Sequence, residues 1–194
     1  MQDRIISSAG QRRVTFAEFL AFTRDRPDGE KWELFDGEMV LQASANNRHQ
    51  TIVANVTALL KQVEWQTEAS WAVLPGLGVH DQTAPDSATI PDVIVRPRSM
   101  GTENFCDDLI VAFEVLSPST RKRDLEWKRR YYTSLPAPQA YVVIDTKKCL
   151  VRLYARAAGW KELRLDHADA ALELPMLGAA LKLSDIYRDT GLST

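Results

Sequence analysis

Two acidic side chains stand in or beside apolar segments of the sequence, where carboxylates are unusual. Glu114 lies within residues 109–116, which read LIVAFEVL, and Asp92 lies between Pro91 and the apolar run 93–95. If residues 109–116 form a strand, alternate side chains face opposite sides of a sheet, and both sides of this strand are apolar. A lone buried carboxylate is costly unless a proton, a cationic partner or a metal ion compensates its charge. Glu114 therefore needs a compensating group.

The neighbouring strand offers one solution. If residues 89–96 pair with residues 109–116 as a hairpin, Asp92 near the start of one strand approaches Glu114 near the end of the other. Two carboxylates at close range raise each other's pKa unless a positive charge lies between them. Mg²⁺ is a hard ion that takes oxygen ligands, so it could supply that charge. The pair indicates a divalent metal site.

Further charged residues could join this site. Glu33 stands in an apolar extended run, and it could reach the same site or face solvent. Asp124 and Lys128 lie four residues apart on a predicted helix, and Tyr132 follows one turn later on the same face. This helix could return over the sheet and direct Lys128 at the carboxylates. Alternatively, Asp124 and Lys128 could form a surface ion pair that contributes little to stability.

Other interpretations of these charges stay open. Structural ion pairs also occupy strand interiors, so Lys128 or an arginine could neutralise Glu114 without any catalysis. Residues 118–132 are strongly basic and include Arg121, Lys122 and Arg123, which could bind nucleic acid or form a solvated helix face. A glycosidase also uses two carboxylates, but nothing aligns an aromatic sugar platform with these acids.

Composition limits the class of protein. The chain has 194 residues, 45% hydrophobic and 26% charged, which is typical of one globular domain. Its net charge of -2 argues against coating nucleic acid by bulk electrostatics. The apolar runs are far shorter than the roughly 20 residues of a membrane span, and the first residues do not resemble a secretory signal, so we expect a cytoplasmic protein with no membrane partner. Cys106 and Cys149 form no CxxC motif.

Hydrophobic periodicity and turn signals predict a mixed α/β domain. Thr15 and Glu18 have capping-box spacing, and the Asp36-Gly37 pair is typical of a hairpin turn. The predicted elements are a helix at 14–22, a hairpin at 32–43, a helix at 49–66, strands within 71–80, 89–96 and 109–116, a helix at 123–135, a meander at 140–165 and a last helical turn within 181–191. We expect one domain over residues 1–194, with a core at about 30–165 and a central mixed sheet flanked by helices.

The order of several motifs resembles a known family. The segments WELFDGEMV, NNRHQTIVANV, PDVIV, FEVLSPST, RDLEWKRRYY and LPAPQAYVVIDTKK occur in the order and approximate spacing of the Uma2 family, also called DUF820. This family of restriction endonucleases belongs to the PD-(D/E)XK nuclease superfamily. The resemblance extends from about Thr15 to the segment LSDIY at 183–187 and implies a restriction-endonuclease-like central sheet.

The resemblance also implies roles for particular residues. Asp92 and Glu114 correspond to the metal-binding pair of the superfamily, and Glu33 corresponds to a glutamate that often joins the site. His49 matches a histidine recurrent in the family, which contacts the site or the substrate, or makes a structural hydrogen bond at the start of a helix.

One position departs from the superfamily pattern. The usual lysine would follow Glu114 by two residues, where this chain has Leu116. Lys128 is the nearest replacement, with Asp124 and Tyr132 as supporting residues on the same helix.

A function follows from this resemblance. It implies an endonuclease that depends on Mg²⁺ or Mn²⁺ and hydrolyses phosphodiester bonds in DNA. The alternative is an inactive module of the same fold that binds nucleic acid or a protein partner. Because cutting both strands of a duplex takes two active sites, we expect a symmetric homodimer.

Overall fold

A six-stranded sheet forms the centre of the molecule. The computed structural model describes residues 4–6, 13–27 and 29–192. Within the sheet the strand order is β11-β10-β9-β8-β6-β4, and neighbours are antiparallel except for β8 and β9, which are parallel. The strands are β4 (Trp71–Pro75), β6 (Val93–Pro97), β8 (Val111–Val115), β9 (Ala140–Ile144), β10 (Val151–Ala155) and β11 (Glu162–Leu165). The predicted mixed α/β fold with a central mixed sheet is confirmed.

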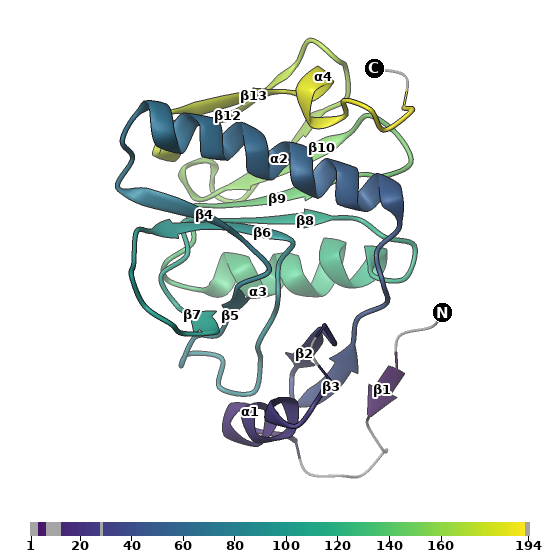
Figure 1. Cartoon of the computed structure of the whole chain (residues 1–194), viewed down its shortest axis with the longest axis vertical. Helices are drawn as coiled ribbons and strands as arrows, with labels where there is room; N and C mark the ends of the chain where they lie inside the picture. Colours follow the sequence, from purple (N-terminus) through teal and green to yellow (C-terminus); the bar gives the residue numbers. More distant parts are fainter. Residues whose placement is uncertain (1–3, 7–12, 28, 193–194) are drawn as a thin grey trace.

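Helices cover both faces of this sheet (Figure 1). One face carries α2 (Asn47–Gln66), whose apolar residues Ile52 and Val56 pack into one buried cluster with the sheet. The other face carries a π-helix, η1 (Arg123–Lys128), which continues into α3 (Arg129–Ser134). A strand between two covered faces reads as a nearly continuous apolar run, as the sequence of β8 does.

Side-chain alternation along β8 sets the direction of Glu114. Phe113 and Val115 belong to the cluster on the α2 side, whereas Ala112 and Leu116 belong to the cluster on the α3 side. Glu114 shares the parity of Ala112 and therefore faces η1 and α3. The alternation predicted for residues 109–116 is wrong at the start of this range. The strand begins at Val111, and Leu109 packs in the cluster on the α3 side.

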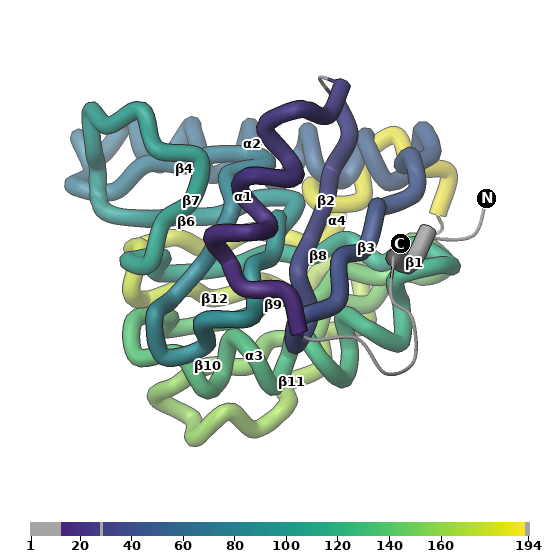
Figure 2. Tube along the Cα trace, turned by 90° about the horizontal axis from the view of Figure 1, so that it is seen from below, coloured from purple at the N-terminus to yellow at the C-terminus, as the bar shows by residue number. Residues whose placement is uncertain are grey.

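A smaller N-terminal unit lies against one end of this layered core. Helix α1 (Phe16–Arg24) has the predicted capping box of Thr15 and Glu18. The predicted hairpin consists of β2 (Trp32–Phe35) and β3 (Glu38–Leu41), and its turn residues Asp36 and Gly37 both have positive φ, 50° and 82°. A short strand not expected from the sequence, β1 (Arg4–Ile6), pairs with β3. Figure 2 shows α1 and this hairpin in front of the sheet.

Two sets of contacts fix the hairpin to the core. The backbone groups of Leu34 and Ala88 exchange hydrogen bonds of 2.8 Å in both directions. The indole N–H of Trp127 donates to Asp36 Oδ2 at 2.7 Å, and its ring meets the Phe35 ring edge-on at 4.7 Å. The hairpin is therefore held both by the segment that precedes β6 and by η1.

The remaining elements complete the fold. The predicted meander is confirmed as β9, β10 and β11. The single strand expected within 71–80 is interrupted at Gly76, where φ is +71°, and is divided between β4 and β5. The last helical turn is confirmed as α4 (Leu183–Ile186), and the hairpin of β12 (Ala171–Leu174) and β13 (Ala179–Lys182) before it was not predicted. The other short elements are β5 (Gly78–Val79), β7 (Phe105–Cys106), η2 (Arg156–Ala158) and η3 (Pro175–Leu177). In the described part of the chain, every helix is too short or too polar to span a bilayer.

Candidate active site

Lys128 lies at the centre of a buried group of carboxylates. Its Nζ is 2.8 Å from Glu114 Oε1, 2.9 Å from Glu33 Oε1 and 3.6 Å from Asp124 Oδ1. The lysine side chain is only 1% exposed. The structure thus brings together four of the residues selected from the sequence, although they come from three separate segments.

Glu33 reaches this group because of how the hairpin docks. Pairing between Leu34 and Ala88 places β2 beside the segment that leads into β6. Glu33 Oε1 accepts a hydrogen bond of 2.7 Å from the backbone N–H of Ile90, and the residue is completely buried. Of the two positions that the sequence left open for Glu33, the structure shows the one inside the site.

Asp92 lies at the end of the sheet, immediately before β6. The register pairs Val93 with Phe113, so Asp92 lies at the level of Glu114. Asp92 Oδ2 accepts a 2.8 Å hydrogen bond from the backbone N–H of Val115 and lies 3.2 Å from His49 Nε2. The expected antiparallel pairing of these two strands is confirmed, and it brings both acids to one end of the sheet.

His49 reaches Asp92 from the first turn of α2. The helix begins with Asn46 as its N-cap, whose side chain accepts the backbone N–H of His49. Among the described residues, His49 Nδ1 is buried without a hydrogen-bond partner. The histidine therefore contacts the carboxylate of a predicted metal ligand, in addition to starting a helix.

Tyr132 approaches Glu114 from one turn beyond Lys128. Its hydroxyl donates to Glu114 Oε1 at 3.4 Å and lies 2.7 Å from Thr89 Oγ1. Burial, followed by the nearby charge of Glu114, raises the pKa of Tyr132 well above its usual value. The hydroxyl therefore stays protonated and serves as a donor to Glu114.

The π-helix explains why Asp124 and Lys128 both point inward. A π-helix forms i→i+5 hydrogen bonds, and its turn is wider than the about 3.6 residues of an α-helix. Residues four apart are then more nearly aligned along the helix. Both side chains are 1% exposed. The sequence predicted a helix here, but nothing in its apolar spacing distinguished a π-turn from an α-turn.

The charges of the site do not balance. Glu33, Asp92, Glu114 and Asp124 are four carboxylates, against one lysine and His49. Even with His49 protonated, two negative charges are left over. Burial, followed by the charges of neighbouring acids, raises the pKa of Glu114 well above its usual value despite Lys128. The same causes raise the pKa of Asp124 to about 6. Protons or an added cation must therefore compensate the excess charge.

Two other groups are stabilised in their charged forms. Burial alone would raise the pKa of Asp92, but the hydrogen bond and charge of His49 and the Val115 N–H lower it below its usual value. Burial alone would lower the pKa of Lys128, but the charges of Glu114, Glu33 and Asp124 raise it well above its usual value. The ammonium of Lys128 and the carboxylate of Asp92 therefore persist at neutral pH.

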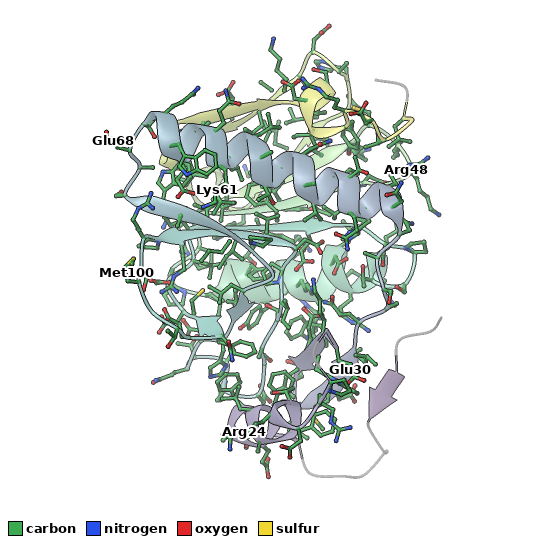
Figure 3. All side chains as sticks on the ribbon, in the orientation of Figure 1. Arg24, Glu30, Arg48, Lys61, Glu68 and Met100 are labelled. Atoms are coloured by element: carbon green, nitrogen blue, oxygen red, sulfur yellow. The ribbon has the colours of Figure 1, made fainter. Side chains whose placement is uncertain are left out.

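A pocket of about 940 Å³ opens onto these groups. Its walls include His49, Asp92, Glu114 and Lys128, together with residues from the hairpin and from the loop after β8. In Figure 3 the labelled Glu30, another wall residue, lies beside the hairpin, and Arg48 marks the end of α2 that carries His49. The four predicted residues therefore border a space that can hold a small ion or part of a substrate, and Lys128 and Glu114 lie deepest, with side chains 1% and 5% exposed.

Sequence reasoning missed part of this pocket. Ser117 and Thr120 lie in the turn after β8 and hydrogen-bond each other, with Ser117 Oγ accepting the Thr120 N–H at 3.1 Å. Both also line the pocket, as do Lys31 and Gln50. Each of these four residues lies within a few positions of Glu33, His49 or Glu114 in the sequence, and this closeness is the signal that could have identified them as pocket residues.

The three basic residues proposed to bind nucleic acid lie outside the pocket wall. Arg121 Nη1 pairs with the buried Asp145 at 2.9 Å, and the guanidinium of Arg123 lies 4.7 Å above the ring of Phe35. Lys122 is exposed. Arg121 and Arg123 thus have contacts within the fold, and Lys122 is the member of the set that extends into solvent.

The donor set fits a magnesium ion that keeps part of its water shell. Within the described residues, no three His, Cys, Asp or Glu side chains form a metal centre of their own. Mg²⁺ is usually held by one or two carboxylates, with water and substrate oxygens completing its shell. Asp92 and Glu114 offer two carboxylates at the pocket, and the raised pKa of Glu114 shows that its charge is not fully compensated by Lys128.

Comparisons with known proteins identify the family of this chain. A family model, Uma2, described as "Putative restriction endonuclease", matches residues 16–184. An uncharacterized protein of Synechocystis is 27% identical over 164 residues, which cover 82% of this chain and 84% of that protein.

A solved structure shows the same fold. It is the crystal structure of a protein of Anabaena variabilis described as a putative nuclease belonging to DUF820. It superposes with a TM-score of 0.75 at 17% identity, covering 90% of this chain and 97% of the other. At that identity the likeness concerns the fold alone.

Proposed function

Because the chain belongs to the Uma2 family, we propose that it is a divalent-metal-dependent endonuclease that hydrolyses phosphodiester bonds in DNA. The family and the nuclease-like fold support a nuclease in general. The DNA substrate rests on the family's description as restriction endonucleases, and the metal rests on the site. The observation that carries the metal is the convergence of Asp92 and Glu114 at one pocket, beside acids whose charge Lys128 and His49 compensate only in part.

Asp92 and Glu114 would hold Mg²⁺ or Mn²⁺. Hydrogen bonds and ion pairs engage Asp92 Oδ2 and Glu114 Oε1, so the other oxygen of each carboxylate is the one offered to the ion. When bound, such an ion neutralises charge on the phosphate and lowers the pKa of a water molecule toward neutrality. His49 keeps Asp92 ionised and fixes its orientation, as outer partners of metal ligands do.

Lys128 and Glu33 act on the other side of Glu114. The Lys128 ammonium lines the pocket, so it can orient a nucleophilic water or stabilise the charge that develops on the phosphate. Glu33 holds this ammonium through a 2.9 Å contact and is itself held by the Ile90 N–H. Lys128 therefore replaces, from a helix, the lysine that the superfamily pattern places two residues after Glu114.

Cleavage assays with matched variants test this proposal. Supercoiled plasmid and single-stranded DNA are incubated with Mg²⁺ or Mn²⁺, with and without a chelator. We expect metal-dependent cleavage that falls by about 100-fold or more in Asp92→Asn and Glu114→Gln. Glu126→Gln removes a negative charge from the exposed side of η1 and should leave cleavage unchanged. Cleavage that survives both site substitutions in folded protein would reject the assigned residues.

One observation favours a second candidate function. Lys128 is buried and held by two carboxylates, as it would be in a purely structural cluster. The chain would then be an inactive nuclease-fold module that binds nucleic acid or a protein. For this alternative, DNA binds with a steep salt dependence and stays intact with every metal.

A homodimer is a further part of the proposal. Cutting both strands of a duplex takes two sites, so we expect a symmetric dimer. Light scattering of the purified protein measures this directly, and a monomer that still cuts both strands would contradict it.

A further inference from the structure

We propose that Asp124 is a positioning residue that receives the Lys128 ammonium when a divalent cation binds Glu114. This inference rests on the proposed metal site. Lys128 would move from Glu114 Oε1 toward Asp124 and keep its contact with Glu33, so that the ammonium and the bound cation no longer share the Glu114 carboxylate.

The apo arrangement places Lys128 in competition with the metal. Lys128 Nζ lies 2.8 Å from Glu114 Oε1, one of the two carboxylates proposed to hold the ion. Two cations so close to one carboxylate repel each other strongly in a buried site. Moving Lys128 into solvent would break its buried contacts, and the lysine is only 1% exposed. A second acceptor inside the protein avoids that cost.

Asp124 has the properties of such an acceptor. Its side chain is 1% exposed, neither of its buried carboxylate oxygens has a hydrogen bond of good geometry among the described residues, and only the Thr120 side chain and the charge of Lys128 stabilise its ionised form. Buried carboxylates in folded proteins are normally hydrogen-bonded, so an unbonded one calls for an explanation. Asp124 is absent from the pocket wall, whereas Glu114 and Lys128 belong to it. A cation in the pocket would therefore meet Glu114, and Asp124 would stay available to Lys128.

The required movement is small. The 3.6 Å gap from Lys128 Nζ to Asp124 Oδ1 exceeds an ordinary N–H···O distance of about 2.9 Å by less than one ångström. Because the two residues are aligned on η1, rotation about the lysine side-chain bonds can close this gap without moving the backbone. Glu33, at 2.9 Å, can keep its contact and act as a pivot.

Metal affinity measured without DNA tests this exchange. Isothermal titration calorimetry with Mn²⁺ is carried out on the full chain and on Asp124→Asn, which keeps the shape of the side chain and removes its charge. We expect Asp124→Asn to weaken Mn²⁺ binding by about tenfold or more, while Glu126→Gln, on the exposed side of the same helix, changes it by less than about twofold.

A double-mutant cycle separates positioning from simple loss of charge. If Asp124 acts through the lysine, Asp124→Asn should change the Mn²⁺ affinity little in a Lys128→Met background. A loss of affinity that is equally large in that background would overturn the proposal, because Asp124 would then act on the metal directly. Unchanged affinity in the single variant would overturn it as well.

A measurement on the unsubstituted protein covers the case in which Asp124→Asn does not fold. The ¹⁵N resonance of the Lys128 ammonium, assigned by its loss in Lys128→Met, should shift when Mg²⁺ is added. A resonance that stays unmoved at saturating Mg²⁺ would overturn the exchange while leaving the metal site intact. Absence of any Mn²⁺ or Mg²⁺ binding would instead reject the proposed metal site and the exchange together.

Discussion

Asp92 Oδ2 accepts the backbone N–H of Val115, the residue directly after Glu114. The carboxylate takes the place of a backbone carbonyl at the point where the pairing of β6 and β8 ends. One acid is thus fixed by the strand that carries the other, and their relative position depends on the sheet more than on the surrounding loops. Sites built on strands are held more precisely than sites built on loops.

Replacement of Lys128 should destabilise the fold. Lys128→Met leaves Glu33 and Glu114 buried without their cation, and breaking a buried pair in this way costs about 3–5 kcal/mol. Urea denaturation in the presence of a chelator measures the free energy of unfolding. Lys122→Met, on the exposed side of the same helical segment, is the control and should change stability by less than about 0.5 kcal/mol. Equal losses in both variants would contradict the central role of Lys128.

Stability without metal should depend on pH through Asp124. Its pKa is near 4 in the unfolded chain and, because of burial and neighbouring acids, about 6 in the fold. Between these values the unfolded chain releases the proton while the folded protein keeps it. The free energy of unfolding therefore falls as pH rises from about 4 to about 6.

Denaturation in chelator at a series of pH values measures this slope. Asp124→Asn should remove the contribution, and Glu126→Gln should keep it. A slope in this window that is the same in all three proteins would assign the titration to another group.

His49 should control the ionisation of Asp92. Without its hydrogen bond and charge, burial would raise the pKa of Asp92 toward or above its usual value. A ¹³C NMR titration of the carboxyl carbons in His49→Ala measures this change. Cleavage should fall by about 10- to 100-fold, as is usual when an outer partner of a metal ligand is lost. His167→Ala, at an exposed position, should leave both quantities unchanged.

Gly37 should be required for the hairpin that delivers Glu33. A Cβ at Gly37 would lie 2.5 Å from Arg13 Cβ, and its φ is +82°. Gly159 also has a positive φ, +62°, but a Cβ there meets nothing within 4 Å. Thermal denaturation should therefore show a larger loss for Gly37→Ala than for Gly159→Ala, by about 1 kcal/mol or more. Equal losses would mean that backbone strain alone determines both.

Local sequence patterns predicted much of the fold. Capping spacing located α1, the Asp36-Gly37 pair located the hairpin turn, and an apolar helical stripe located α2, although that helix begins two residues before the predicted start. These features depend on neighbours within a few residues. The β12–β13 hairpin was missed although Pro175 and Gly178 mark its turn, because its four-residue strands are defined by pairing with each other.

The acids of the candidate site were also selected from the sequence, but the distances between them were not predicted. Acids within apolar segments are conspicuous in a sequence, which is why Asp92, Glu114 and Glu33 were selected. The distances among them depend on docking between distant segments, above all between Leu34 and Ala88. The burial of Asp124 and the contacts of Arg121 with Asp145 could not be predicted, since each depends on packing between elements far apart in the chain.

The π-turn at η1 makes the site sensitive to chain length as well as to residue type. Each residue of an α-helix advances the next side chain by about 100° around the axis. Deleting one residue between Thr120 and Lys128 would turn the ammonium away from Glu114, even if every residue that touches the pocket were kept. Among relatives, an insertion or deletion in this short segment should therefore abolish activity more often than many substitutions would.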